Sequence, residues 1–266
     1  MLLAVDIGNT NILFGVHDGS EWRHHWRVRT VRDKMADEYG VLVRALLREA
    51  SLALADFDRI AIASVVPPLT GRIEEMLADE TPVDPLIISH SVDTGMRYAI
   101  DNPAELGADL IADAVAAYAR LGEACVVVDF GTATTFTAIT GDAVVLGVAI
   151  APGMNLAASA LAGGTAQLPQ IRLVPPSRAI GRNTVDSIRS GVVLGYVGLV
   201  EGMIGRFQAE MAQSSAGTSG ADGDIKVLAT GGLSSVIAPL TRRFYAVDPW
   251  LTLDGIRIIG ERCVPQ

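Results

Sequence analysis

Apolar and polar residues follow the same pattern at two places in the chain, residues 4–14 (AVDIGNTNILF) and residues 127–137 (VVDFGTATTFT). In each, a β-branched apolar run ends at an aspartate, a glycine follows two positions later, and a second apolar run begins after small polar residues. This predicts a strand, a tight turn and a returning strand. Two such hairpins predict two related halves, residues 1–120 and 121–266, that face one another across a cleft.

The remaining apolar patterns predict further strands and helices in the first half. Alternation over residues 21–30 predicts an outer strand that carries Trp22, Trp26 and Val28 on one face. Helical spacing over residues 37–51 predicts a helix with Val41 on its apolar side. A wholly apolar run at residues 60–66 predicts a buried strand, and Pro67-Pro68 predicts a loop after it.

Two helix starts follow from capping signals. Asn102-Pro103 with Glu105 predicts a helix start, which Gly107 delays to Ala108, so that Asp109 lies in an early turn and Asp113 one turn later. Residues 179–211 form the longest helical pattern and open near Asn183. Its five glycines each cost about 1 kcal/mol against alanine, so they indicate close helix contact, either within the chain or between subunits.

Composition narrows the classes of function. A net charge of −9 and the lack of any basic run argue against nucleic acid. Two cysteines without a CxxC pair make a disulfide scaffold improbable and fit a reducing cytoplasm. The uncharged stretch at residues 143–166 contains Pro152-Gly153 and Gly163-Gly164, which predict a strand, a turn and a short helix rather than a membrane span. Residues 214–223 predict an exposed, mobile loop.

The two turns suggest phosphate chemistry without a P-loop. Backbone amides around Gly8 could hold phosphate oxygens because glycine lets a ligand approach closely, although a lone turn of this kind is more often only structural. The lysine motif GxxxxGK[ST] is absent. Asp6 and Asp129 could bind Mg²⁺ or simply cap their turns. Asp109 could be a general base or an acidic residue that favours a helix start.

The order of motifs resembles the type III pantothenate kinase family, within the superfamily of sugar kinases, heat-shock ATPases and actin. The resemblance runs through nearly the whole chain. It rests on eight motifs in order: DIGNTN at 6–11, DNP at 101–103 with GAD at 107–109, VDFGTATT at 128–135, APG at 151–153, TAQLP at 165–169, GRNT at 181–184, TGG at 230–232 and DPWLTLDG at 248–255.

The resemblance implies an α/β fold of two ribonuclease-H-like (actin-like ATPase) domains, each a mixed sheet with flanking helices. It implies a cytoplasmic homodimer that transfers the ATP γ-phosphate to an alcohol group, the 4′-hydroxyl of pantothenate, as the first step of coenzyme A biosynthesis. Together with the composition, this gives the expectation of no nucleic-acid or membrane partner. Carried over by matching position, the implied site residues are Asp109 as proton acceptor; Asp6, Gly8, Asn9, Thr10, Asn11 and Thr132 for ATP, with Asp6 as a candidate Mg²⁺ ligand; Asp129 for a monovalent cation, K⁺ or NH₄⁺; and Gly107, Ala108 and Thr184 for pantothenate.

Two positions depart from the family pattern. Leu110 stands where the family usually has arginine, and Ile100 stands where many members have tyrosine. An apolar side chain cannot replace a bidentate cation. Two alternatives therefore stay open beside the kinase: a catalytically impaired relative that binds nucleotide or a pantothenate-like ligand and acts through a partner, and, more weakly, a polymerising actin-like ATPase.

Overall fold

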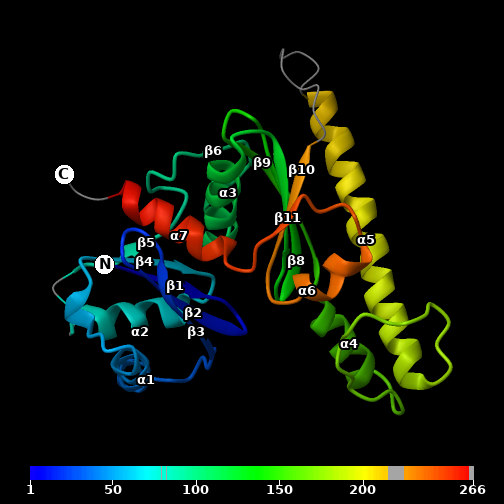
Figure 1. Cartoon of the computed structure of the whole chain (residues 1–266), viewed down its shortest axis with the longest axis horizontal. Helices are drawn as coiled ribbons and strands as arrows, with labels where there is room; N and C mark the ends of the chain where they lie inside the picture. Colours follow the sequence, from blue (N-terminus) through cyan, green and yellow to red (C-terminus); the bar gives the residue numbers. More distant parts are fainter. Residues whose placement is uncertain (79, 82, 215–224, 264–266) are drawn as a thin grey trace. The chain divides into compact units, whose positions relative to one another are not determined.

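The computed structural model describes residues 1–78, 80–81, 83–214 and 225–263, which form two compact units. Unit 1 comprises residues 1–96, 101–116 and 251–266, and unit 2 comprises residues 97–100 and 117–250. The elements are labelled in Figure 1. The loop expected at residues 214–223 falls almost wholly on residues 215–224, which lie outside the described part of the chain.

The sheet of unit 1 has five strands in the order β3-β2-β1-β4-β5. Its strands are β1 (Leu2–Ile7), β2 (Asn11–His17), β3 (Trp22–Arg29), β4 (Arg59–Ser64) and β5 (Leu86–Ile87). The β1–β2 and β2–β3 pairs are antiparallel, whereas β4 runs parallel to β1 and β5 parallel to β4. The sheet is therefore mixed, and the predicted hairpin around Gly8 is confirmed.

The sheet of unit 2 repeats this arrangement. Its strands are β6 (Arg97–Tyr98), β7 (Cys125–Phe130), β8 (Ala133–Ile139), β9 (Val144–Pro152), β10 (Lys226–Thr230) and β11 (Ala246–Val247). The order β9-β8-β7-β10-β11 has the same sequence of antiparallel and parallel pairs as in unit 1, and β6 is added beside β9. The repeat read from the two aspartate turns therefore extends to whole sheets.

Helices pack on these sheets. Unit 1 contains α1 (Ala36–Glu49), α2 (Pro67–Ala78), α7 (Leu251–Arg262) and residues 108–116 of α3 (Ala108–Leu121), whereas unit 2 contains the end of α3, α4 (Met154–Gly163), α5 (Thr184–Ser214) and α6 (Ser234–Ile237). Short 3-10 turns lie at η1 (Leu54–Asp56), η2 (Pro103–Glu105) and η3 (Ala238–Leu240). The predicted strand, turn and helix in residues 143–166 are confirmed as β9 and α4.

The two faces of the unit 1 sheet are buried by different helices because side chains alternate along β1. Leu3, Val5 and Ile7 belong to a core cluster that includes residues of α1 and α2. Leu2, on the opposite face, lies against Gly260 of α7. Figure 1 shows α1 and α2 on one side of these strands and α7, in red, on the other.

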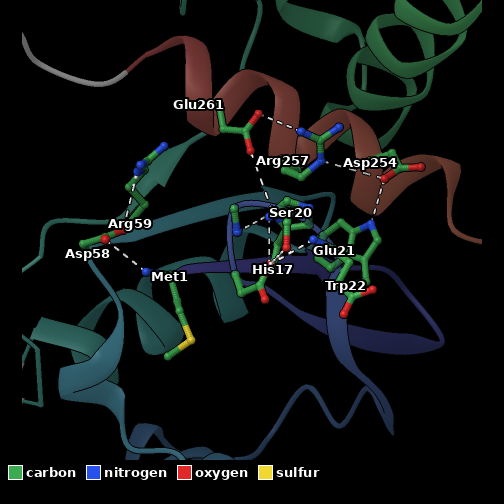
Figure 2. Close-up of polar contacts among 12 residues, drawn as sticks. Met1, His17, Ser20, Glu21, Trp22, Asp58, Arg59, Asp254, Arg257 and Glu261 are labelled. Carbon is green, nitrogen blue, oxygen red and sulfur yellow. Dashed lines mark hydrogen bonds and ion pairs between the residues drawn. The ribbon is translucent and has the colours of Figure 1, made fainter.

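A β-bulge in β3 changes which face Trp22 occupies. His17 pairs with Trp22, but the preceding Val16 pairs with His24, so Arg23 is an extra residue. Trp26 packs against the core under α1 and α2, whereas Trp22 donates a 2.8 Å hydrogen bond from Nε1 to Asp254 Oδ1 on α7 (Figure 2). The prediction that Trp22 shares a face with Trp26 was therefore wrong.

Helix α7 belongs to unit 1 although it is the last described element of the chain. It packs on β1 and β4. Figure 2 shows Arg257 of this helix between the carboxylates of Asp254, one turn before it, and Glu261, one turn after it. The expected division after residue 120 places α7 in the second half, whereas in the structure α7 packs with the first. Helix α7 packs with the first half because it covers the second face of the sheet that contains β1.

Two local expectations in the first half differ from the structure. Pro67-Pro68 opens α2 instead of a loop, since proline at a first helical position loses no helical hydrogen bond. Helix α1 lies within one or two residues of its predicted range, but it buries Tyr39, Val43 and Leu47 and leaves Val41 63% exposed. The apolar positions of α1 permitted more than one face, and packing chose between them.

Helix α5 starts at Thr184, one residue after its cap Asn183, whose Oδ1 accepts a 2.9 Å hydrogen bond from the Asp186 amide. This confirms the predicted start. A Cβ built at any of the five glycines 191, 195, 198, 202 and 205 would meet no atom within 4 Å. In the described chain these glycines thus face open space rather than a neighbouring element. By length and composition alone, α5 is the one described helix that could cross a membrane, and its most apolar window is 28% buried.

Candidate active site

Thr30, the residue after β3, holds the turn from Gly8 to Asn11 through two hydrogen bonds. Asp6 is the penultimate residue of β1, and the Gly8 amide donates a 3.0 Å hydrogen bond to the Asn11 carbonyl across the turn. Thr30 donates from its Oγ1 to the Gly8 carbonyl at 2.6 Å and from its amide to the Thr10 carbonyl at 3.0 Å. The turn is therefore held in one conformation while the side chain of Thr10 stays exposed.

Asp109 lies in the first turn of α3, as predicted. Asn102 caps a 3-10 turn through a 3.3 Å hydrogen bond from the Ala104 amide and donates to Glu105 Oε1 at 2.8 Å, and α3 itself begins at Ala108. The capping signal was therefore real, but it opens η2 rather than the long helix. Gly107 lies between the two, and its carbonyl accepts a 3.1 Å hydrogen bond from the Ile111 amide of α3.

The carboxyl group of Asp109 is partly buried and contacts the backbone of its own helix. Its Oδ1 accepts a 2.7 Å hydrogen bond from the Leu110 amide, and burial raises the pKa of the group, although that amide opposes the shift. A Cβ on Gly107 would lie 2.5 Å from the same oxygen. Any other residue at position 107 would require this carboxyl group to move, and the raised pKa of Asp109 favours uptake of a proton.

Asp109 and the first turn lie at the same end of the unit 1 sheet. The Val65 amide, directly after β4, donates a 3.1 Å hydrogen bond to the carbonyl of Ile7, directly before Gly8. The Val65 side chain lies 3.3 Å from the Cβ position of Gly107. Gly107 and Ala108 therefore join Asp109 at the carboxyl end of β1 and β4, where ligands bind in open α/β sheets.

In unit 2, three glycine turns surround the end of β7. Asp129 pairs with Thr230 of β10, and Gly231 follows with φ +86°. A Cβ on Gly231 would overlap Asp129 Oδ1, and one on Gly131 would lie 3.1 Å from Oδ2. The Gly153 amide donates a 3.0 Å hydrogen bond to the Thr132 carbonyl. Motifs read separately in the sequence thus converge on Asp129 and Thr132.

The departures from the family pattern have different surroundings. Leu110 is 7% exposed and buried like a core residue of α3. Ile100 follows β6 and is half-buried. Position 110 therefore contributes apolar packing and presents no cation to the site.

The structure groups the predicted residues by unit. Asp6, the turn from Gly8 to Asn11, and residues 107–109 meet at one end of the unit 1 sheet. Asp129 and Thr132 meet in unit 2, and Thr184 is the exposed first residue of α5. Across the described ranges, no three His, Cys, Asp or Glu side chains come together as a metal cluster. Mg²⁺ is often carried by one or two carboxylates together with phosphate oxygens, which needs no such cluster.

Comparison with known proteins places this geometry in a family context. A family model described as type III pantothenate kinase matches residues 2–206. A type III pantothenate kinase from Moorella thermoacetica is 46% identical over 262 residues, which cover 98% of this chain and 99% of that protein.

Solved structures show the fold. A putative 2-dehydro-3-deoxygalactonokinase from Sinorhizobium meliloti has a TM-score of 0.60 at 13% identity, with 100% of each chain covered. MreB 5 of Spiroplasma citri bound to AMPPNP has a TM-score of 0.57 at 9% identity, covering 98% of this chain and 96% of that one. The two mixed sheets are therefore those of the sugar-kinase and actin-like ATPase fold.

Proposed function

We propose that Asp109 is the general base of this chain, which belongs to the type III pantothenate kinase family. As a member of that family it is a phosphotransferase that makes 4′-phosphopantothenate for coenzyme A biosynthesis. The observation that carries this proposal is the position of the partly buried Asp109 carboxyl group at the end of the sheet that also carries the Asp6 turn. The other site assignments below belong to the same proposal.

In the proposed step, the 4′-hydroxyl oxygen of pantothenate bonds to the γ-phosphorus of ATP while the bond from that phosphorus to the β–γ bridging oxygen breaks. ADP leaves, and the hydroxyl proton passes to the Asp109 carboxylate. Burial raises the proton affinity of that carboxylate, which suits it to the role. Gly107 and Ala108 are proposed to contact pantothenate, since they form the backbone beside Asp109.

For ATP we propose the residues of the first turn, Asp6 and Gly8 to Asn11, together with Thr132. The turn fits a phosphate because it presents the exposed polar side chains of Asn9 and Thr10 and is braced by Thr30. Asp6 fits Mg²⁺, which is often carried by one or two carboxylates plus phosphates. Bound there, Mg²⁺ would offset phosphate charge.

Asp129 is proposed to hold a monovalent cation, K⁺ or NH₄⁺. The proposal is supported by the position of its carboxylate, which is partly exposed at the end of β7 and lies close to the backbone of Gly131 and Gly231. A cation there would balance the charge of the carboxylate.

We propose that the protein is a homodimer and that α5 contributes to its interface, so that Thr184 reaches pantothenate in the assembly. The glycines of α5 recur every three or four residues along one stripe and face open space in the single chain. Small residues at this spacing let two helices approach closely. Gly198→Trp should shift the mass measured by light scattering from dimer to monomer, whereas Gly71→Trp on α2 should not.

A cytoplasmic location without a nucleic-acid or membrane partner is part of the same proposal. The net charge of −9 supports it, because such a charge repels both phosphodiester backbones and anionic lipid surfaces. Sedimentation with vesicles rich in anionic lipid tests the membrane part, and retention of the protein in the supernatant is the expected result.

The decisive experiment gives the purified protein ATP, Mg²⁺ and pantothenate, with potassium or sodium, and follows 4′-phosphopantothenate by mass spectrometry. We expect turnover that requires potassium and falls about 10²- to 10⁴-fold in Asp109→Asn. Asp84→Asn, an exposed carboxylate of the same unit, is the matched control and should keep wild-type activity.

Wild-type protein that binds ATP but makes no product, and gains activity in Leu110→Arg, would instead indicate the impaired relative. Turnover in Asp109→Asn equal to that of the wild type would remove Asp109 from the mechanism while leaving the family activity in place.

A further inference from the structure

One row of side chains crosses the unit 1 sheet beside the Asp6 turn. Asp6 pairs with Leu13 on β2, and Leu13 pairs with Arg27 on β3. Directly opposite residues in antiparallel strands point to the same face with Cβ atoms about 5 Å apart. Asp6 and Arg27 therefore share one face of the sheet, with Leu13 between them. In the next row, Asn11 pairs with Arg29 and shares that face.

This part of the face is more exposed than the part that lies under α7. One row further from the turn, Gly15 lies under Trp22 and Leu253, and Ala4 is fully buried. In the rows of Asp6 and Asn11, by contrast, Asp6, Leu13 and Asn11 are partly exposed and both arginines are exposed. The sheet face thus passes from a covered half to an accessible half at the proposed ATP turn.

The accessible half of the face carries two positive charges, Arg27 and Arg29, beside a turn that has no phosphate-binding lysine. The only lysines in the sequence are Lys34 and Lys226, and neither lies in the first turn. A third arginine, Arg32, already bonds the turn, donating from Nη2 to Asn9 Oδ1 at 2.7 Å. Nucleotide phosphates beside the Asp6 carboxylate need cations to offset the repulsion between like charges.

The geometry points to Arg27 and Arg29 as phosphate-binding residues that hold the nucleotide on this face, opposite Asp6 and Asn11. The inference deepens the proposed function and rests on it for the position of ATP. An arginine presents five donors in a planar fork, so a contact to the protein leaves donors for phosphate oxygens. The arginines take no part in the proton transfer. Their part is to bind and orient ATP.

The test compares ATP affinity by calorimetry for the wild type, Arg27→Gln, Arg29→Gln and the double variant, with the full chain in each case. We expect the dissociation constant to rise about tenfold for each single variant and further for the double variant. Arg27→Lys keeps the charge but loses the fork and should lie between wild type and Arg27→Gln. Arg23→Gln is the matched control, since Arg23 is exposed on the same strand but pairs with Asp18 and Glu21.

Two further readouts separate binding from folding and from the kinase activity itself. The variants should keep the thermal midpoint of the wild type, and kcat/KM for ATP should fall while KM for pantothenate stays constant. A double variant whose dissociation constant for ATP lies within twofold of the wild type overturns the inference, even if the wild type phosphorylates pantothenate. A wild type that binds ATP without phosphorylating pantothenate refutes the proposed function, and the ATP affinities still decide the role of the arginines.

Discussion

The hydroxyl of Thr252 on α7 donates a 2.7 Å hydrogen bond to Oδ1 of Asp113 on α3, across 139 positions of sequence. Asp113 is 1% exposed and lies one turn after Asp109. Three residues after Thr252, Gly255 packs directly on the carbonyl of Ala112, where a Cβ would overlap the oxygen. Helix α7 therefore fixes the position of the helix that carries the proposed base.

Thr252→Val removes this donor while keeping the shape of the side chain. We expect the free energy of unfolding to fall by about 1–3 kcal/mol, because a buried acceptor loses a hydrogen bond to a neutral partner. Urea unfolding followed by circular dichroism measures it. Thr252→Ser, which keeps the hydroxyl, should recover most of the loss, and equal losses in the two variants would contradict the hydrogen-bond explanation.

Gly255→Ala forces α7 away from α3. The added methyl group would overlap the Ala112 carbonyl, so we expect a loss of about 1–3 kcal/mol or more together with reduced kcat. The matched control is Gly71→Ala on α2, where a Cβ meets no atom within 4 Å. That change should stabilise the protein by up to about 1 kcal/mol through helix propensity. A neutral Gly255→Ala would show that α7 shifts freely.

The raised pKa of Asp109 predicts the pH dependence of both activity and stability. A base must be ionised, so kcat should fall about tenfold per pH unit below the raised pKa. Because the folded state binds this proton more tightly than the unfolded state, the group opposes folding increasingly as pH rises from the ordinary aspartate pKa through the raised one.

Asp109→Asn removes the unfavourable contribution of the ionised carboxylate to the free energy of folding. At pH 7 the variant should be at least as stable as the wild type, by an amount on the order of 1 kcal/mol, and the difference should vanish below the ordinary pKa of aspartate. Parallel unfolding curves at several pH values provide the measurement. A variant less stable than the wild type at pH 7 would show that the ionised carboxylate is stabilised in the fold.

Gly231→Ala tests whether activation by potassium depends on the position of the Asp129 carboxylate. Gly231 has φ +86°, and a Cβ there would overlap Asp129 Oδ1, so the carboxylate must move. We expect the activation of kcat by potassium to be lost. Gly19→Ala shares the positive φ, +100°, but a Cβ there meets no atom within 4 Å. It should cost stability through backbone strain yet keep potassium activation, and loss of that activation in both variants would point to a general effect of strain.

Much of the local structure was predictable from the sequence. The turn at Gly8, the 3-10 cap at Asn102 and the start of α5 at Asn183 follow from preferences of single residues and their nearest neighbours. Predictions failed where several local solutions were open. The apolar positions of α1 allowed Val41 to be buried, and it is exposed, whereas the bulge at Arg23 reversed the face of Trp22.

The sequence by itself determined the two aspartate hairpins, the family resemblance and the position of Asp109 in the first turn of α3, because these depend on order and short-range chemistry. Only the tertiary structure decided that α7 returns to unit 1, that Gly231 closes on Asp129, and that Arg27 shares a sheet face with Asp6. Those relationships depend on strand register and on burial between distant segments. A single sequence does not encode either in any local pattern.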